Sequence, residues 1–543
     1  MLELRVFGPP GTGKTTRLAE RIGTAARKFG GDQVVVASFT KAAASEIASR
    51  GLPVDRQNVG TLHSLCFRAL GMPTLTESKI ADWNKDHPAL TIGGKAADLD
   101  EPSSDVAMGQ ALGDKLLSAM GRLRERQIPH AAWPNDVTEF ARLWNGWKEE
   151  SGLLDFTDLI ERAWLDVGAL PGRPQIGIFD EAQDFSKLQL SLIRKWAEQM
   201  EYILVAGDDD QTLYDFAGAT PDAFLDPPIP DRQREILEQS FRVPRVIHAL
   251  ASTWIKQVHR REEKIYKPRD ADGSIDHSPA TFIRPEPLLS EIETALKENK
   301  SIMILAPCGY MLEPMLKLLR SHGIPFCNPY RKKRGDWNPL RAHGVKQTTV
   351  VDRLLAYLEP KGGNSFINVW TAKQIELWAE HVKAETTFHR GQKTELSKYA
   401  ELLGDGGDTS DFLALIETAF INPAEVLALA DQTPPPVAWL LDRLLSSKAA
   451  GYKFPVAVLE RRGIDALKAQ PKVVIGTIHS VKGGESDVVC MFPDLSAAGM
   501  EQWVRDGDGR DSTVRMFYVG MTRARERLVL CSPSGAYHAR IAG

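Results

Sequence analysis

Short apolar runs and amphipathic stretches alternate along the first part of this chain. The run LELRVF at residues 2–7 predicts a buried strand, and residues 15–28 follow with apolar or small side chains at every third or fourth position. That spacing is typical of one face of a helix. The run QVVVASF at residues 33–39 predicts a second buried strand, and an alanine-rich helix is expected at residues 41–50.

The same alternation returns further along the chain. Apolar runs predict strands at residues 175–179, 202–206, 301–306, 473–478, 488–492 and 528–531. Strands that alternate with helices favour a parallel sheet with helices on its faces. Two long stretches, residues 71–149 and 329–469, lose the strand signal and are mostly helical in pattern.

These interruptions predict an α/β fold with two parallel-sheet domains, each interrupted by a mostly helical insertion. We expect residues 1–70 and 150–230 in the first domain and residues 71–149 in its insertion. The second domain is expected at residues 231–328 and 470–543, with residues 329–469 as its insertion. A chain of 543 residues is too long for a single hydrophobic core, which agrees with this division.

A glycine-rich loop follows the first predicted strand. Its sequence GPPGTGKT fits the phosphate-binding pattern between a strand and a helix. Glycines permit positive φ and let backbone N–H groups close around phosphate oxygens, while Lys14 supplies charge and the Thr15 hydroxyl suits Mg²⁺. The candidate nucleotide-binding residues here are Gly8, Pro9, Pro10, Gly11, Thr12, Gly13, Lys14, Thr15 and Thr16.

Two acidic residues follow the predicted strand at residues 175–179. Asp180 is placed to hold Mg²⁺, and Glu181 to orient and deprotonate an attacking water, as a nucleotide hydrolase needs opposite its phosphate loop. The alternative interpretation is an acidic surface turn. Together with Lys14, the pair favours nucleotide hydrolysis.

Charge and cysteine content narrow the remaining classes. The net charge of −4 gives no general basic character, so any nucleic-acid binding must come from a local groove. The five cysteines show no Cys-x-x-Cys pair, which argues against a disulfide framework or a zinc site. Because the first strand begins at residue 2 and no apolar run is long enough for a membrane span, we expect no signal peptide, no membrane partner and a cytoplasmic location.

An ordered series of motifs resembles the UvrD/Rep/PcrA-like superfamily 1 helicases. Beyond the phosphate loop the series comprises Ser38-Phe-Thr40, Gly60-Thr-Leu-His-Ser64, Asp155-Phe-Thr-Asp-Leu159, Asp180-Glu-Ala-Gln-Asp184, Gly207-Asp-Asp-Asp-Gln-Thr-Leu-Tyr-Asp-Phe-Ala-Gly-Ala219, Ser240-Phe-Arg-Val-Pro244, Thr477-Ile-His-Ser-Val-Lys-Gly-Gly-Glu485 and Tyr518-Val-Gly-Met-Thr-Arg-Ala524. The resemblance covers both predicted sheet domains, which it implies are RecA-like, and neither insertion.

The resemblance implies ATP and Mg²⁺ as cofactors and assigns further residues. Gln211 would sense the γ-phosphate and the water, Arg242 and Arg523 would act as arginine fingers, Glu485 would bind the ribose, and Phe241 would stack on the base. A DNA strand would contact Phe39, Thr40, Thr61, His63, Tyr214, Phe216 and His479. Each aromatic ring stacked on a base contributes about 1–3 kcal/mol.

Local patterns leave some of these assignments with a second interpretation. Arg523 lies in a basic run with Arg525 and Arg527 and would otherwise form a surface ion pair, and Phe39 suits core packing nearly as well as strand contact. We expect polar surroundings for Tyr214 and Phe216. The basic cluster Arg331-Lys-Lys-Arg334 beside Trp337 suits either phosphate contact or a solvated loop.

The chain also departs from the family pattern. Only seven residues precede Gly8, so we expect the upstream glutamine motif that reads adenine to be missing and Phe241 to recognise the base. Thr16 stands where an arginine is frequent, with Arg17 one place later. On the strand side, Lys41-Ala42 replaces Asn-Lys, Gly484 replaces leucine and Ala217 replaces arginine.

The expected function is therefore an ATP-dependent motor on single-stranded and partly duplex DNA. The text Gln-x-x-Tyr-x-Phe-x-Gly-Ala after residue 210 implies 3′-to-5′ movement through the resemblance. The weaker strand-side motifs and the short second insertion leave an alternative, a strand-stimulated translocase or sensor ATPase that serves a nuclease, repair or defence partner and does not unwind alone. A phosphate-loop kinase or nucleotide-gated binding module is a further alternative.

Overall fold

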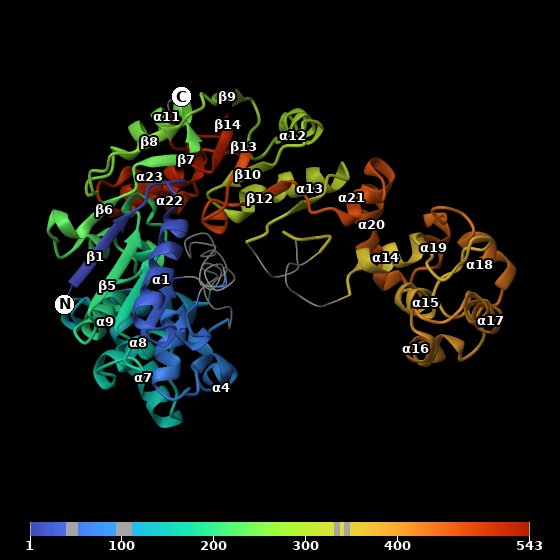
Figure 1. Ribbon diagram of the computed structural model, residues 1–543, viewed down its shortest axis with the longest axis horizontal. Helices are drawn as coiled ribbons and strands as arrows, with labels where there is room; N and C mark the ends of the chain where they lie inside the picture. Colours follow the sequence, from blue (N-terminus) through green and yellow to red (C-terminus); the bar gives the residue numbers. More distant parts are fainter. Residues whose placement is uncertain are drawn as a thin grey trace. The chain divides into compact units, whose positions relative to one another are not determined.

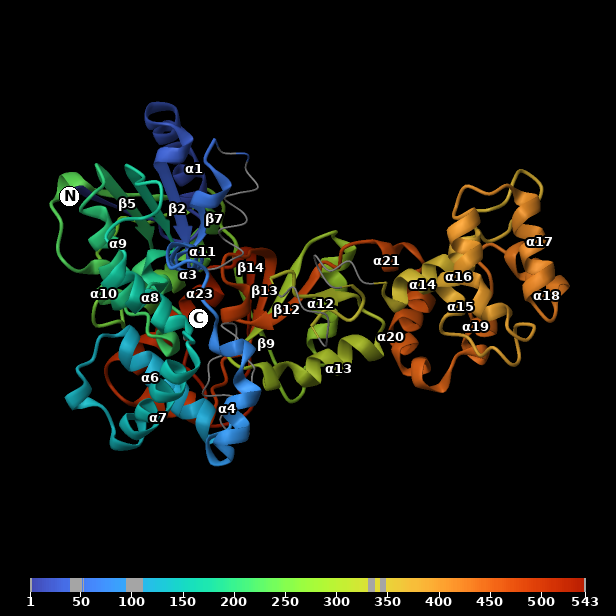
Figure 2. The ribbon, with the colours of Figure 1, turned by 90° about the horizontal axis from the view of Figure 1, so that it is seen from below.

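The computed structural model describes residues 2–39, 51, 53–93, 111–330, 337–341 and 348–541. The chain forms two compact units (Figures 1 and 2). The first unit contains Met1–Leu312 and Gly476–Gly543, and the second contains Glu313–Ile475. The predicted nucleotide-binding and catalytic residues, those of the phosphate loop as well as Arg242, Glu485 and Arg523, all belong to the first unit.

One six-stranded sheet in the first unit carries the phosphate loop. Its strand order is β3-β2-β4-β5-β1-β6, and its neighbouring strands pair in parallel. The strands are β1 (Leu2–Phe7), β2 (Val34–Ser38), β3 (Val59–Thr61), β4 (Ile176–Asp180), β5 (Tyr202–Gly207) and β6 (Arg234–Ile236). The predicted α/β class with parallel sheets is confirmed. The helix expected at residues 41–50 lies outside the described residues.

Helices cover both faces of this sheet because its strands alternate apolar side chains between two cores. Val6, Val34 and Val36 pack with Leu18 and Ile22 of α1 on one face. Phe7, Val35 and Ala37 belong to the core on the other face, with apolar side chains of α3, α8 and α9. The helices are α1 (Lys14–Phe29), α3 (Leu62–Ala69), α8 (Phe156–Asp166), α9 (Lys187–Ala197) and α10 (Pro221–Leu225).

A separate tryptophan-rich core lies between α3 and α8 in the chain order. It is formed by α4 (Ile80–Asp86), α6 (Leu112–Glu125) and α7 (Asn135–Ser151), with Trp83, Trp133 and Trp144 buried in it. This core explains the tryptophans of the strand-free stretch. They are structural side chains of a small helical assembly.

Buried ions fasten this helical assembly to the start of α8. Arg124 contacts Asp155, Asp158 and Glu161 at 3.1, 2.5 and 2.6 Å, and Lys148 contacts Asp155 and Asp158 at 2.7 and 2.5 Å. Asp155 and Asp158 also form a capping box at the N-terminus of α8. We call these five residues the scaffold cluster.

A second parallel sheet lies in the first unit. Its strands run in the order β10-β13-β14-β9, while β7 and β8 form a small parallel pair. The strands are β7 (Gln239–Pro244), β8 (Lys267–Arg269), β9 (Ser274–Ser278), β10 (Ile302–Ala306), β13 (Ser486–Met491) and β14 (Ala524–Cys531). The accompanying helices are α11 (Arg245–Ile255), α12 (Leu288–Lys297), α22 (Ala497–Val504) and α23 (Asp508–Met521).

Helices dominate the second unit. They are α13 (Glu313–Ser321), α14 (Val350–Leu358), α15 (Ala372–Ala379), α16 (Gln392–Leu403), α17 (Thr409–Ala419), α18 (Pro423–Ala430), α19 (Val437–Arg443), α20 (Ser446–Arg462) and α21 (Asp465–Lys468). β11 (Phe326–Cys327) pairs in parallel with the start of β12 (Val473–Thr477). Stacked rings of Tyr357, Trp370 and Trp439 lie in its core. The basic cluster Arg331–Arg334 lies outside the described residues.

Candidate functional site

The phosphate loop connects β1 to the N-terminus of α1. The Gly8 amide donates to the Gly207 carbonyl at 2.9 Å, which ties the loop to the end of β5. Gly11 and Gly13 have φ of 73° and 78°, a region that favours glycine. In the described part of the chain no side chain caps α1, so its first amides point to a position suited to an anion.

Lys14 contacts Asp180, the last residue of β4, and Glu181, the residue that follows β4. Its Nζ is 2.9 Å from Glu181 Oε1 and 3.6 Å from Asp180 Oδ1. Burial would raise the pKa of Glu181, but Lys14 and Lys482 outweigh it and lower that pKa to about 2. Burial, with repulsion from Glu181, raises the pKa of Asp180 to about 6 in spite of Lys14. Glu181 is therefore the acid that is ionised throughout the neutral range.

The backbone at Glu181 is held in a conformation that is rare for a residue with a side chain. Its φ is 55°, in the left-handed region, and its amide donates to Asp180 Oδ1 at 2.8 Å. Such strain persists only where the surroundings fix it, and it is frequent at reacting sites. The turn aims Glu181 at Lys14 rather than along the strand direction.

The residues present fit a magnesium nucleotide. Thr15 offers a half-buried hydroxyl next to Lys14, and Asp180 offers a buried carboxylate. Ser38 lies opposite Asp180 in the β2–β4 register, and its buried Oγ lacks a hydrogen-bond partner within the described residues. A hard cation prefers such oxygen donors, and a buried unpaired hydroxyl at this edge suits a bound polar group.

Arg523 reaches Gln211 from the end of α23. Its Nη2 donates to Gln211 Oε1 at 2.9 Å, and its Nη1 donates to the Gly484 carbonyl at 3.2 Å. Only 1% of Arg523 is exposed, so the surface ion-pair interpretation does not describe it. Arg525 and Arg527 do form such ion pairs, with Glu485 at 3.5 Å and Glu291 at 2.7 Å.

The strand β7 lies directly against the phosphate loop. The Phe241 amide donates to the Gly11 carbonyl at 2.8 Å, and the Phe241 ring is 71% exposed. An accessible ring beside the loop is what stacking on a base requires. Arg242 Nε donates to Glu485 Oε2 at 2.7 Å, so the predicted second finger and the predicted ribose ligand contact each other.

Sequence reasoning missed a buried ion cluster at the end of β5. Lys264 Nζ lies 2.8 Å from Asp208 Oδ1 and 3.0 Å from Asp210 Oδ2 and also contacts Asp209. Arg261 contacts Asp210 at 2.6 Å. We call these five residues the triple-aspartate cluster. The three consecutive aspartates are visible in the sequence, but no local signal pairs them with residues more than fifty positions away.

Lys482 is a second residue to which the sequence pattern assigns no role. Its Nζ donates to the Gln211 carbonyl at 2.8 Å and to an Asp184 carboxylate oxygen, and lies 3.9 Å from Glu181 Oε2. It stands within a motif quoted above. Its contacts with residues that follow β4 and β5 were not visible from that motif.

Four of the predicted strand-contact residues form one aromatic row. Ring centroids are 5.0 Å apart for Phe39 and Tyr214, 5.9 Å for Tyr214 and Phe216, and 6.0 Å for Phe216 and His479. Tyr214 is 3% exposed and its ring packs between the rings of Phe39 and Phe216, while Lys482 Nζ lies 5.3 Å from its ring centroid, so its surroundings are partly aromatic and partly charged. Burial, with repulsion from Lys482, lowers the pKa of His479 to about 4.

Thr61 and His63, which are also predicted strand-contact residues, contact other residues than those of this row. The Thr61 hydroxyl accepts from the Ser64 amide at 3.2 Å and caps α3. The His63 ring contacts Phe156 edge-on at 5.8 Å. Thr40 lies outside the described residues.

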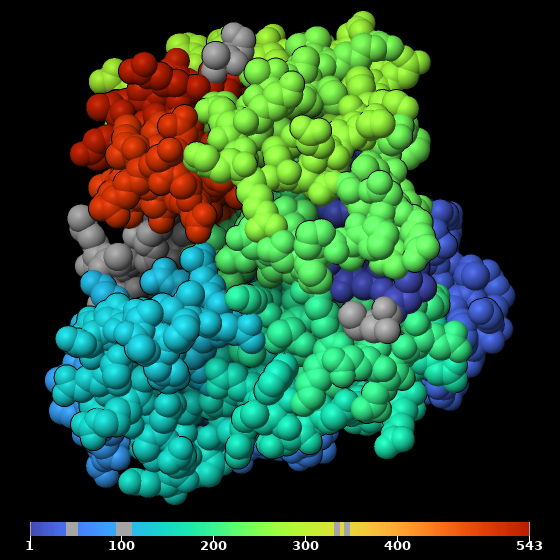
Figure 3. Space-filling model, turned by 90° about the vertical axis from the view of Figure 1, so that its left-hand side faces the viewer, coloured from blue at the N-terminus to red at the C-terminus, as the bar shows by residue number. Residues whose placement is uncertain are grey.

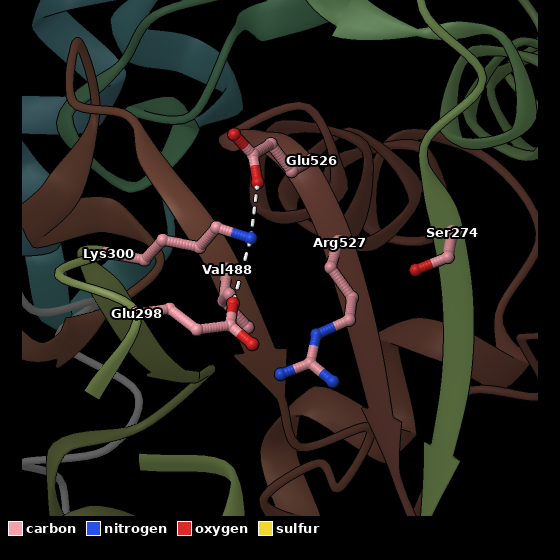
Figure 4. A pocket seen from close by; sticks show the side chains of 6 residues that line it. All are labelled: Ser274, Glu298, Lys300, Val488, Glu526 and Arg527. Carbon is pink, nitrogen blue, oxygen red and sulfur yellow. Dashed lines mark ion pairs between the residues drawn. The ribbon is translucent and has the colours of Figure 1, made fainter. Parts of the chain in front are cut away.

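A small polar cavity of about 220 Å³ lies beside the second sheet (Figure 4). Lys300 lies between Glu298 at 2.9 Å and Glu526 at 3.1 Å, and Ser274, Val488 and Arg527 complete the lining. None of the predicted nucleotide residues lines it. The cavity is therefore separate from the predicted nucleotide site.

Comparison with known families decides which of the expected classes applies. The family model described as UvrD/REP helicase N-terminal domain matches residues 3–227, and the one described as UvrD-like helicase C-terminal domain matches residues 454–534. The chain belongs to the UvrD/Rep-like superfamily 1 helicases. Within this family, the N-terminal match covers the phosphate loop and Glu181, and the C-terminal match covers Glu485 and Arg523.

Curated members of the family are distant in sequence. ATP-dependent DNA helicase UvrD1 of Mycobacterium tuberculosis is 28% identical over 334 residues, which cover 52% of this chain and 42% of that protein. The putative ATP-dependent DNA helicase YjcD of Bacillus subtilis is 26% identical over 98% of this chain and 77% of its own length. The probable DNA helicase II homolog of Mycoplasma capricolum is 22% identical over 98% and 82%. The match thus spans less than half the length of UvrD1.

No helix in the described part of the chain is both long and apolar enough to cross a bilayer.

Proposed function

We propose that this chain is an ATP-dependent DNA helicase that moves along single-stranded DNA in the 3′-to-5′ direction. ATP hydrolysis in the cleft between the two sheets of the first unit would drive it. The observation that carries this proposal is the contact of Arg523 with Gln211, because it brings a guanidinium from the C-terminal motifs to the end of β5. Figure 3 shows the two parts meeting across one face, with blue and teal residues below green and red ones.

The described residues support distinct roles in hydrolysis. The loop amides and Lys14 would hold the phosphates, while Glu181 and Gln211 would orient the attacking water. Arg523 and Arg242 would stabilise charge on the transferring phosphoryl oxygens, since guanidinium groups match that geometry. Supplying these arginines from outside the first sheet makes hydrolysis depend on how the two parts meet.

The cofactor and base contacts follow from the fit described above. Thr15 and Asp180 would hold Mg²⁺, which when bound neutralises phosphate charge. Phe241 would stack on the base and Glu485 would bind the ribose. In the present arrangement Glu485 instead accepts from Arg242, so nucleotide binding would separate these two side chains.

Directional movement rests on the third-motif text and on the aromatic row. Phe39, Tyr214, Phe216 and His479 lie at the ends of strands or in the segments that follow them, where a strand would cross both parts of the first unit. The motif containing Tyr214 and Phe216 resembles the form of the 3′-to-5′ branch. All three relatives reported above are named as DNA helicases, which favours DNA as the polymer.

One observation favours a second function, a strand-stimulated translocase or sensor ATPase that works with a nuclease, repair or defence partner. Tyr214 is almost fully buried, and His479 is buried and held neutral by its lowered pKa. Two of the four rings in the aromatic row are therefore withdrawn from contact with a base in this arrangement. A motor with a weak grip would hydrolyse ATP on a strand without separating a duplex by itself.

A strand-displacement assay separates these functions. The purified chain is given ATP, Mg²⁺ and a duplex with a 3′ overhang, a 5′ overhang or blunt ends, and ATPase is measured with single-stranded DNA, RNA or duplex. Displacement only from the 3′ overhang supports the helicase, whereas strand-stimulated ATPase without displacement supports the second function. Hydrolysis that no strand stimulates overturns both and favours a kinase or a nucleotide-gated module. The control is Lys14→Ala, which should abolish hydrolysis because the phosphate charge is left unpaired.

A further inference from the structure

Lys264 is a cation with a buried side chain near the nucleotide site, and the function described above does not use it. We propose that Lys264 is a positioning residue for ATP hydrolysis, which holds Asp208 and thereby sets Gln211 and Glu181 for attack on the terminal phosphate. This proposal rests on the proposed ATPase function. Within the described residues the ion pairs of Lys264 are with Asp208, Asp209 and Asp210, none of which is a predicted nucleotide-binding residue, so Lys264 would act through these neighbours.

Lys264 binds the three aspartates that follow β5. Its side chain is 1% exposed, and its Nζ contacts a carboxylate oxygen of each residue in the run Asp208–Asp210. The Glu262 amide donates to Asp209 Oδ2 at 2.7 Å, and Arg261 contacts Asp210. Residues 261–264 therefore bind all three aspartates at once, and the position of the run is fixed from outside the first sheet.

Asp208 is the junction that passes this grip to the hydrolytic residues. Its Oδ2 accepts from Gln211 Nε2 at 2.7 Å, while Gln211 Oε1 accepts from Arg523. Its amide donates to Gln183 Oε1 at 3.1 Å, and Gln183 Nε2 donates to Glu181 Oε2 at 2.5 Å. One aspartate thus orients both the glutamine and the glutamate that would hold the water.

The same stretch of chain also contacts the phosphate loop. Tyr266, two residues after Lys264, donates its hydroxyl hydrogen to the Pro10 carbonyl at 2.9 Å. Ser240 Oγ donates to the same carbonyl at 2.9 Å. Residues 261–266 therefore fix the phosphate loop and the water-orienting residues relative to each other, which is the geometry that positioning requires.

A purely structural role for Lys264 is the competing explanation. A buried cation that faces several carboxylates stabilises a fold whether or not catalysis depends on it. Lys148 provides the matched control, because its side chain is 5% exposed and contacts Asp155 and Asp158 at 2.7 and 2.5 Å. It belongs to the scaffold cluster, and within the described residues its ion pairs are with Asp155 and Asp158, neither of which is a predicted hydrolytic residue.

The test compares charge-preserving substitutions at the two lysines. Lys264→Arg and Lys148→Arg keep the positive charge, but a planar guanidinium cannot occupy the point among three carboxylates that an ammonium fills. With strand-stimulated ATPase as the readout, Lys264→Arg should lower kcat by about tenfold or more with little change in KM, since small misplacement of reacting groups is costly. Lys148→Arg should leave both parameters unchanged. Thermal melts of both variants verify that each is folded.

A double variant separates positioning from stability. In a Gln211→Ala background, where the water-orienting amide is already lost, Lys264→Arg should lower kcat much less than it does alone. Equal loss in both backgrounds overturns the positioning of Gln211, and wild-type kcat in Lys264→Arg overturns the positioning role as a whole; either result leaves the proposed function intact. A wild-type chain that hydrolyses no ATP overturns both proposals.

Discussion

Two clusters of charged side chains in the first unit contain the same numbers of acidic and basic groups but connect different segments of the chain. The scaffold cluster and the triple-aspartate cluster each set three carboxylates against two basic side chains. The scaffold cluster fastens α6 and α7 to the start of α8, so it fixes one local junction. The triple-aspartate cluster joins the end of β5 to residues beyond β6, which also contact the phosphate loop.

Their protonation differs as well. Burial would raise the pKa of Asp155, but Arg124 and Lys148 hold it well below its usual range. Burial, with repulsion from Asp210 and Asp208, raises the pKa of Asp209 to about 7 in spite of Lys264. With the same number of charged groups in each cluster, Asp155 is therefore ionised at neutral pH, whereas Asp209 has a pKa close to neutral pH. The role of a buried ion cluster therefore depends on which segments of the chain it connects, and the number of its charges does not reveal that role.

The largest expected effect is the loss of kcat on substitution of Arg523, which contacts Gln211 next to the triple-aspartate cluster. Arg523→Ala should lower kcat for ATP on the order of 10³-fold or more, because a finger stabilises charge in the transition state. Nucleotide affinity, measured by titration with a fluorescent analogue, should fall far less. Arg527→Ala is the control, since Arg527 pairs with Glu291 and should be dispensable for turnover. Equal losses of kcat and affinity in Arg523→Ala would count against a finger.

A second substitution contrasts an acid of the nucleotide site with one of the scaffold cluster. Glu181→Gln should lower kcat on the order of 10²–10⁴-fold, because the amide cannot accept the proton of the attacking water. Nucleotide binding should persist, since Lys14 remains in place. Glu161→Gln, which weakens a contact with Arg124, should leave turnover unchanged. Retained turnover in Glu181→Gln would remove the assignment of a general base.

The scaffold cluster itself should control stability rather than rate. Asp155→Ala leaves Arg124 and Lys148 short of a buried partner and removes half of the capping box. We expect the free energy of unfolding to fall by roughly 3–5 kcal/mol, as when one member of a buried ion pair is deleted. Denaturant unfolding measures this, and kcat of the folded variant at low temperature should match the wild type. A lower kcat in fully folded protein would erase the contrast between the clusters.

The smallest expected effect concerns pH. Because the folded-state pKa of Asp209 is raised above its ordinary value of about 3.9, the folded chain binds a proton more tightly than the unfolded chain between these values. Its contribution to stability should therefore fall as pH rises from about 4 to 7. Asp209→Asn should flatten the dependence of Tm on pH in this window. Asp155→Asn should instead change the dependence below about pH 4, where a lowered pKa loses its stabilising effect.

Apolar runs in the sequence predict most of the central strands. β1 is predicted at its observed bounds, and β2, β4 and β5 differ by one or two residues, because each is a buried run of five or six residues. The three-residue strands β3, β6 and β8 are too short to give a pattern. β7 and β9 are polar and partly exposed, so their pairing depends on neighbours that are distant in sequence.

The candidate site also contains residues that a local sequence pattern predicts and residues whose position depends on distant parts of the chain. The phosphate loop, Asp180 and Glu181 are predictable because each function is encoded within a few adjacent residues. Lys264 and Lys482 are not, because their partners are brought close only when β5 meets the later part of the chain. The burial of Tyr214 was also unpredictable, since it depends on how Phe39 packs against it. The roles of the site residues remain predictions.

Gly11 has a further consequence as a spacer between two working parts. A Cβ at this position would lie 2.4 Å from Arg242 Cβ and 2.9 Å from Ser240 Oγ. A single methyl group there would act as a wedge between the phosphate loop and β7, in addition to straining a backbone with φ of 73°. The absence of a side chain at Gly11 thus gives the phosphate loop the clearance to lie directly against Arg242 and Ser240 of β7.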